Sequence, residues 1–152
     1  MIEVRHATPG DLDALAVLFD GYRQFYGQPS DPAAGRAFLE ARMQQQESTI
    51  LFAAETGRAL GFCQLYPIFS SVSMRRAWLL NDLYVAPEAR GRGTGEALLE
   101  AAAAHGRATG AAWLMLQTAQ DNLPAQRLYA RAGWQQDAHF QTHLLDLSGN
   151  PL

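Results

Sequence analysis

Hydrophobic and polar residues alternate along much of this chain, and the period of the alternation separates strands from helices. Ile2, Val4 and His6 alternate with Glu3 and Arg5, a period of two that predicts a strand. Apolar or alternating runs bounded by turn residues predict five further strands, at 50–54, 59–69, 75–85, 112–118 and 140–147. A short strand near Trp134 is also expected.

Apolar residues spaced three and four positions apart predict the helices between these strands. The helix starts carry side chains that can cap a helix, or a proline at the first turn. The predicted starts are Thr8-Pro9, Asp31-Pro32, Gly93 and Asp121-Asn122. The third helix is expected to end near Ala108, before Gly110, and the fourth at Ala132.

The predicted order of elements is β-α-α-β-β-β-α-β-α-β. Consecutive strands in the first half favour antiparallel pairing, and the β-α-β order of the second half favours parallel pairing. With 152 residues and no linker-like segment, the chain is expected to form a single α/β domain over residues 1–152.

Composition narrows the class of protein. A hydrophobic content of 48% with 18% charged residues is typical of a globular protein, and no apolar run is long enough to span a membrane. The net charge of −3 argues against nucleic-acid binding. The start of the chain lacks the features of a signal peptide, and the lone Cys63 allows no internal disulfide, so we expect a cytoplasmic protein with Cys63 in its core.

All 12 basic residues are arginine. The absence of lysine excludes a phosphate loop of the Walker type and any mechanism through a lysine Schiff base.

The segment from Arg90 to Gly95 joins an apolar strand to an alanine-rich helix, and it contains three glycines and two arginines. Glycine allows the backbone to come close to a ligand, and the first turn of a helix offers free N–H groups and the positive end of its dipole. The segment therefore predicts a phosphate-binding turn. The alternative is a glycine-rich turn that only allows tight packing of strand against helix.

A second motif extends the first. Asn122, Ala125, Tyr129 and Gly133-Trp134 follow the spacing N-x-x-A-x-x-x-Y-x-x-x-G-F, with tryptophan in place of phenylalanine. Together with Arg90-x-x-Gly93-x-Gly95 they resemble the GNAT superfamily of acetyl-CoA-dependent N-acetyltransferases over nearly the whole chain. Three segments resemble the histone/polyamine acetyltransferase branch, namely 64–71, 80–85 and 117–122.

The resemblance implies a mixed, mostly antiparallel sheet, splayed between its fourth and fifth strands, with acetyl-CoA in the split. It implies that backbone N–H groups of the turn bind the pyrophosphate and that the preceding strand binds the pantetheine arm, with the N–H of Leu83 or Val85 polarising the thioester carbonyl. Asn122 would hydrogen-bond pantetheine. The implied cofactor-binding residues are Leu83, Tyr84, Val85, Arg90, Gly91, Arg92, Gly93, Thr94, Gly95, Asn122, Ala125 and Tyr129.

The resemblance also implies that Tyr129 gives a proton to the departing thiolate of CoA. Full transfer from a phenol of pKa near 10 to a thiolate whose acid has a pKa near 8.5 is uphill by about 2 kcal/mol. Tyr129 is therefore expected to act as a hydrogen-bond donor that stabilises the developing thiolate. The alternative is a tyrosine that only packs in the core.

An acceptor amine of pKa about 10.4 must lose a proton before it can attack. Polyamine acetyltransferases of the family often carry glutamate on the strand before the loop, where this chain has Asn81, which cannot be a base. Asp82 is the catalytic candidate if a β-bulge turns it toward the site. Glu55 and a water relay are the next candidates for the base. The alternative for Asp82 is a structural carboxylate paired with an arginine.

Several other side chains are weaker candidates. Tyr26 is considered for the acceptor pocket. Tyr22, Tyr66 and Phe69 are considered as well, but core packing is favoured for these three. His105 is expected to pack or to lie at the surface, and His139 and His143 lack further ligands at metal-binding spacing, so no metal site is expected.

These observations predict an enzyme that transfers acetyl from acetyl-CoA directly to a primary amine, either of a small polyamine- or amino-acid-like molecule or of a peptide lysine. A non-catalytic acyl-CoA-binding regulatory module and a protein that binds another phosphate ligand are the alternatives. The alternating run 140–147 could supply the edge of a homodimer.

Overall fold

A five-stranded sheet runs through the middle of the molecule, with its strands in the order β1-β2-β3-β4-β5. The computed structural model describes residues 1–149. The strands are β1 (Glu3–His6), β2 (Thr49–Glu55), β3 (Arg58–Ser70), β4 (Arg75–Val85) and β5 (Leu114–Met115). The first four pair antiparallel and β4 pairs parallel with β5, which confirms the predicted mixed, mostly antiparallel sheet.

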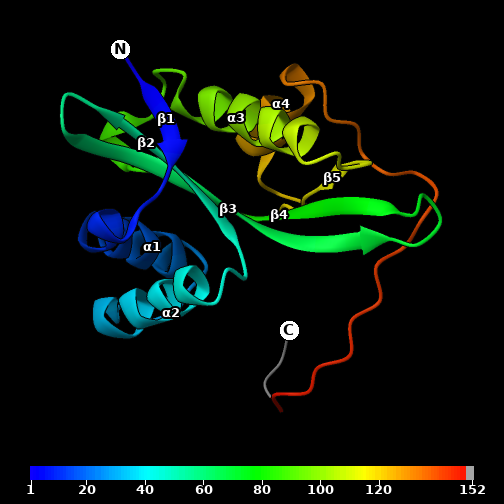
Figure 1. Cartoon of the computed structure of the whole chain (residues 1–152), viewed down its shortest axis with the longest axis horizontal. Coiled ribbons are helices and arrows are strands. Elements are labelled where there is room, and N and C mark those ends of the chain that lie inside the picture. Colours follow the sequence, from blue (N-terminus) through cyan, green and yellow to red (C-terminus); the bar gives the residue numbers. More distant parts are fainter. Residues whose placement is uncertain (150–152) are drawn as a thin grey trace.

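Helices cover both faces of this sheet (Figure 1). Helices α1 (Leu12–Phe25) and α2 (Pro32–Gln44) pack on one face, and α3 (Thr94–Ala108) and α4 (Leu123–Arg131) lie on the other. The predicted start at Thr8-Pro9 is a 3-10 turn, Pro9–Asp11, that leads into α1. Asp31 and Asn122 cap α2 and α4, because their side chains accept backbone N–H bonds from Ala34 and Ala125.

The core lies between β2, β3 and β4 and the helices on either face. Phe62, Leu15, Leu39 and Leu98 are fully buried in it. Cys63 has no exposed surface, and burial raises the pKa of its thiol to about 12. Such a thiol is not a nucleophile at neutral pH, and the prediction of Cys63 as a core residue is confirmed.

A β-bulge interrupts the pairing of β3 with β4. Gln64 lies opposite Asp82 and the next residue, Leu65, lies opposite Leu80, so Asn81 is the extra residue of β4. Neighbouring residues of β3 point to opposite faces, and therefore Asp82 and Leu80 also face opposite sides of the sheet. The bulge places Asp82 on the face covered by α1.

The sheet opens between β4 and β5. Strand β5 pairs with β4 only at Trp78–Leu114 and Leu79–Met115. Within residues 1–149, residues 80–85 of β4 have no strand beside them on this edge. The predicted splay between the fourth and fifth strands is therefore present, because the chain after Met115 diverges from β4 toward α4.

Two strand predictions were wrong, and a third had the wrong bounds. The fifth strand covers two residues instead of 112–118, and neither 140–147 nor the segment near Trp134 forms a strand. After α4 the chain extends away from the body of the molecule, past the β3–β4 hairpin (Figure 1), with Phe140, Leu144, Leu145 and Leu147 exposed. Alternation shows that a segment is suited to a sheet, but a strand forms only where a second edge is present to pair with it.

None of the helices in the part of the chain that the structure describes has the length and apolar character needed to cross a membrane.

Candidate active site

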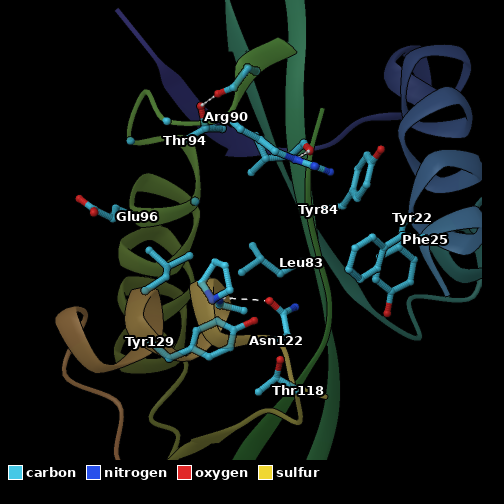
Figure 2. A pocket seen from close by; sticks show the side chains of 18 of the residues that line it. Tyr22, Phe25, Leu83, Tyr84, Arg90, Thr94, Glu96, Thr118, Asn122 and Tyr129 are labelled. Atoms are coloured by element: carbon cyan, nitrogen blue, oxygen red, sulfur yellow. Dashed lines mark hydrogen bonds between the residues drawn. The ribbon is translucent and has the colours of Figure 1, made fainter. Parts of the chain in front are cut away.

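A cavity of about 620 Å³ lies where β4 and β5 separate. Helix α1 forms one wall, the end of β4 the floor, and the start of α3 and helix α4 the opposite wall (Figure 2). The lining includes all but one of the predicted cofactor-binding residues: Leu83, Tyr84, Val85, Arg90, Gly91, Gly93, Thr94, Gly95, Asn122, Ala125 and Tyr129. Arg92 is the one that is missing from it.

The turn before α3 is built to expose its backbone. Gly91 and Gly93 have φ values of 74° and 85°, in the left-handed region that glycine adopts without strain. A Cβ added at either glycine would have no neighbour within 4 Å, so open space lies beside both. Among the described residues no side chain caps α3 at Gly93, and the N–H groups of its first turn are left for a ligand.

The two arginines of this turn have different surroundings. The Nε atom of Arg90 donates to the carbonyl oxygen of Val85 at 3.0 Å, and its guanidinium lies over the ring of Tyr84 (Figure 2). Arg92 forms an ion pair with Glu55 instead, outside the cavity lining. Of these two arginines, only Arg90 therefore brings positive charge to the cavity wall.

Helix α4 presents Asn122 and Tyr129 to the cavity across from Leu83 (Figure 2). The Asn122 Oδ1 atom accepts the N–H of Ala125 at 3.3 Å, which leaves the amide Nδ2 to donate to a ligand. Burial raises the pKa of Tyr129, and its electrostatic interaction with Tyr26 adds to the rise, while a hydrogen bond with Thr118 opposes it. The Tyr129 phenol is thus protonated at neutral pH and able to donate.

Asp82 lies behind the cavity wall and not in it. Its side chain is 2% exposed, and its two oxygens accept hydrogen bonds from Gln64 Nε2 and Asn81 Nδ2, each at 2.7 Å. Burial raises the pKa of Asp82, and hydrogen bonds from Asn81, Gln64 and Tyr22 oppose the rise. Within residues 1–149 Asp82 forms no ion pair with an arginine, so the alternative of a structural carboxylate paired with arginine is not what the structure contains.

Tyr22 connects this carboxylate with the cavity. Its ring lines the cavity from α1, and its hydroxyl donates to the carbonyl oxygen of Asn81 at 3.1 Å. The charge of Asp82 raises the pKa of Tyr22 further above the value that burial alone produces. Asp82 is therefore one side chain away from the cavity.

Glu55, the other carboxylate considered as a base, is placed poorly for that role. It lies at the end of β2 and pairs with the N-terminal amine at 2.8 Å and with Arg92. These two partners lower its pKa, the amine having the larger effect, and Glu55 is not part of the cavity lining.

The aromatic residues considered for the acceptor pocket divide into two pairs. Tyr22 and Tyr26 line the cavity, whereas Tyr66 and Phe69 do not, and Phe69 is exposed with the guanidinium of Arg76 over its ring. Tyr22 packs against the core, as expected, and also lines the cavity.

Phe25 and Thr118 also line the cavity, although neither is among the residues predicted from the sequence. Phe25 precedes Tyr26 at the end of α1, and Thr118 ends the segment that leads to Asn122. The only sequence signal is their position beside predicted site residues, because their residue types carry no chemistry that marks a site.

The histidines lie away from the cavity. His105 packs against Trp78 and His6, with ring centroids 4.7 and 5.3 Å away, as expected of a packing residue. His139 and His143 are exposed in the extended C-terminal segment. In residues 1–149, no three side chains of the types His, Cys, Asp or Glu are grouped so that they could hold a metal ion.

Comparison with known proteins identifies the class to which this fold and cavity belong. The family model described as the acetyltransferase (GNAT) family matches residues 15–134, and the chain belongs to this family. The chain is accordingly an acetyltransferase, and members of the family generally use acetyl-CoA as the acetyl donor.

Individual relatives agree with this assignment. The chain is 46% identical over 146 residues to a Bacillus subtilis protein named as the uncharacterised N-acetyltransferase YhfO, which covers 96% of this chain and 98% of that protein. It is 26% identical over 140 residues to a D-amino-acid N-acetyltransferase of Saccharomyces cerevisiae, covering 90% of this chain and 86% of the yeast protein. A crystal structure of a probable acetyltransferase, 43% identical, superposes with a TM-score of 0.93 over 97% of this chain and 99% of the other.

Proposed function

We propose that this chain transfers acetyl from acetyl-CoA directly to a primary amine, with the cavity between β4 and β5 as the active site. The observation that carries the proposal is the arrangement of that cavity. It has a glycine turn and an uncapped helix N-terminus at one end, and a protonated tyrosine facing the end of a strand at the other. This arrangement suits an elongated ligand with phosphate at one end and a thioester at the other.

In this proposal the backbone N–H groups from Arg90 to Gly95 bind the pyrophosphate of acetyl-CoA, and Arg90 contributes charge. The pantetheine arm lies along Leu83, Tyr84 and Val85, where β4 has no strand beside it, and the Nδ2 atom of Asn122 donates to it. Arg92 is assigned no contact with phosphate through its side chain, because Glu55 holds it.

The reaction then needs one base, one oxyanion donor and one acid. The amine nitrogen attacks the thioester carbonyl carbon, and the backbone N–H of Leu83 or Val85 stabilises the negative oxygen that develops. When the carbon–sulfur bond breaks, Tyr129 donates to the departing thiolate. The proton lost by the amine passes to Asp82 through the Tyr22 hydroxyl or a water molecule. Cys63 takes no part, and no acyl-enzyme forms.

For the acceptor we propose a polyamine- or amino-acid-like amine or a peptide lysine. The yeast relative is named for D-amino acids. The deciding experiment follows CoA thiol release from acetyl-CoA with a panel of polyamines, L- and D-amino acids, aminoglycosides and lysine peptides. Thiol release with at least one amine, and detection of the acetylated product, supports the proposal.

The burial of Asp82 and the presence of Asn81 favour one alternative, a module that binds acyl-CoA without catalysis. Such a module binds acetyl-CoA but releases no thiol with any amine. A protein for another phosphate ligand would show no rise in unfolding temperature with acetyl-CoA. The same panel and a thermal shift assay therefore separate the three functions. We place the reaction in the cytoplasm, where the free Cys63 thiol stays reduced.

Replacing Gly93 with alanine is expected to weaken acetyl-CoA binding about tenfold or more. The added Cβ lies beside the first-turn N–H groups, and the φ of 85° costs about 1–2 kcal/mol for a residue with a side chain. Isothermal titration calorimetry measures the affinity. Gly57→Ala is the matched control, because Gly57 also has a positive φ of 76° and open space around it but lies in the β2–β3 turn. Equal affinity in the two variants would contradict the assignment of the turn to pyrophosphate.

We also propose that the chain forms a homodimer through residues 140–147. Their apolar side chains are exposed, and Leu145 and Leu147 are 84% and 89% accessible. The double variant Leu144→Asp/Leu145→Asp is expected to be monomeric in analytical ultracentrifugation, and the parent dimeric. Val72→Asp, at an equally exposed residue of the β3–β4 turn, is expected to leave the dimer intact. A monomeric parent at working concentration would refute this proposal.

A further inference from the structure

A chain of hydrogen bonds runs from the surface to Asp82 on the α1 side of the sheet. The hydroxyl of Ser48 donates to Oε1 of Gln64 at 2.7 Å, and Nε2 of Gln64 donates to Oδ2 of Asp82 at 2.7 Å. Gln64 has no exposed surface and Asp82 is 2% exposed, while Ser48 is partly exposed where the chain enters β2. A fully buried glutamine that bonds a buried carboxylate needs a reason beyond packing.

The donor end of the Gln64 amide faces Asp82, and the Ser48 hydroxyl bonds its acceptor end. A carboxamide has an acceptor end and a donor end. The Ser48 hydroxyl donates to Oε1, and the NH₂ end is turned to the carboxylate. In the reversed amide, the carbonyl oxygen would stand against an oxygen of an ionised carboxylate, which is repulsive. The observed orientation therefore favours the ionised form of Asp82.

No positive charge performs this task. The titratable groups whose pKa the charge of Asp82 raises are Tyr22 from α1 and Cys63 and Tyr66 from β3. All three are neutral at neutral pH. Within residues 1–149 Asp82 has no ion-pair partner, so hydrogen bonds from Gln64, Asn81 and Tyr22 are what stabilise its negative charge.

We propose that Gln64 is a positioning residue that holds Asp82 ionised and in place behind the cavity wall, and that Ser48 supports Gln64 by donating to its carbonyl oxygen. This inference rests on the proposed role of Asp82 as the base. Gln64 acts through Asp82 and touches neither acetyl-CoA nor the amine. The β-bulge at Asn81 makes the arrangement possible, because it brings Asp82 opposite Gln64 on the same face of the sheet.

The test is the titration of Asp82 itself, followed by carbon NMR of protein labelled at the aspartate carboxyl carbons, with Asp82→Asn to assign its signal. Gln64→Met keeps a similar volume and removes the donor, and it is expected to raise the pKa of Asp82 by about one to two units. Ser48→Ala is expected to produce a smaller shift in the same direction. Gln45→Met, at an exposed residue where α2 ends, is the control and should produce none.

The pH profile of kcat/KM with the best amine of the panel is the second readout. Its acid limb is expected to move to higher pH together with the pKa of Asp82 in Gln64→Met. A purely structural role would lower the unfolding temperature and leave the pKa of Asp82 where it is in the parent. That result overturns the inference.

The remaining outcomes are also decisive. If Gln64→Met does not fold, Ser48→Ala decides, since Ser48 is partly exposed, and an unchanged pKa of Asp82 in that variant refutes the inference. If the pKa shifts but the acid limb stays in place, Gln64 does control the ionisation of Asp82, and the base role assigned to Asp82 is what fails. The NMR titration needs no substrate, so it decides the effect of Gln64 even if no amine is acetylated.

Discussion

Tyr129→Phe is expected to lower kcat by about 10²–10⁴-fold and to leave the affinity for acetyl-CoA within a few-fold of the parent. The phenol ring packs in the cavity wall beside Trp134, and phenylalanine keeps that packing. What is lost is the O–H that donates to the thiolate as the carbon–sulfur bond breaks. Because the hydrogen bond from Tyr129 to sulfur forms only as negative charge develops there, its loss affects turnover and not binding.

Steady-state kinetics of thiol release and calorimetric titration with acetyl-CoA measure the two quantities separately. Tyr66→Phe is the matched control, since its hydroxyl lies outside the cavity lining, and it is expected to turn over within a few-fold of the parent. Burial holds the pKa of Tyr129 above its ordinary value of 10.0, so loss of its proton does not limit the parent at neutral pH. An unchanged kcat in Tyr129→Phe would exclude the acid role.

Asp82→Asn is expected to lower kcat/KM by about 10²–10⁴-fold near neutral pH. The variant retains the shape of the side chain but cannot accept a proton from the amine. Its deficit should shrink as the pH approaches the pKa of the amine, about 10.4 for a lysine-like acceptor, because the amine then arrives unprotonated. The pH profile from about 6 to 10 measures this convergence. A deficit that stays constant across the range would point to a structural defect instead of a lost base.

The same substitution is expected to make the stability of the protein less dependent on pH. Burial raises the pKa of Asp82 in the folded state above its ordinary value of 3.8. At pH values between 3.8 and the raised pKa of the folded state, the folded protein binds more protons than the unfolded chain. The contribution of Asp82 to stability therefore falls as the pH rises through this range. Asparagine removes this pH dependence, but its NH₂ group then faces one of the two amide donors from which Asp82 accepts. Thermal unfolding of the parent and the variant from about pH 4 to about pH 7 checks this, with Asp13→Asn, at an exposed carboxylate of α1, as the control.

Large parts of the fold follow from local patterns. The glycines at 91 and 93 adopt the positive φ that a strand-to-helix turn requires, and α3 begins at Thr94, one residue after the predicted start. Asp31 and Asn122 cap the helices that follow them. These features depend on a few neighbouring residues, which explains why periodicity, capping and turn chemistry were sufficient to predict them.

The base candidate shows where local patterns stop being sufficient. Regular alternation along β4 would place Asp82 on the same face of the sheet as Leu80. The bulge at Asn81 reverses this and places Asp82 on the face covered by α1. The bulge could be anticipated from the family resemblance. The partners that hold Asp82, however, come from β3 and α1, and no spacing within β4 indicates that Gln64 and Tyr22 meet it there.

The sequence by itself determined most of the helices and strands, the mixed sheet with its splay, and the residues of the turn and of α4 that line the cavity, because each depends on short-range geometry or on a family motif. Only the tertiary structure decided the rest. Tyr22 and Phe25 line the cavity, and Arg92 pairs with Glu55 outside it. Asp82 is buried behind Tyr22, and residues 140–147 lie outside the sheet. Each of these depends on which segments pack together across long distances in the chain. Burial, ion pairing and strand pairing each need two segments in contact, whereas a sequence pattern describes one segment at a time.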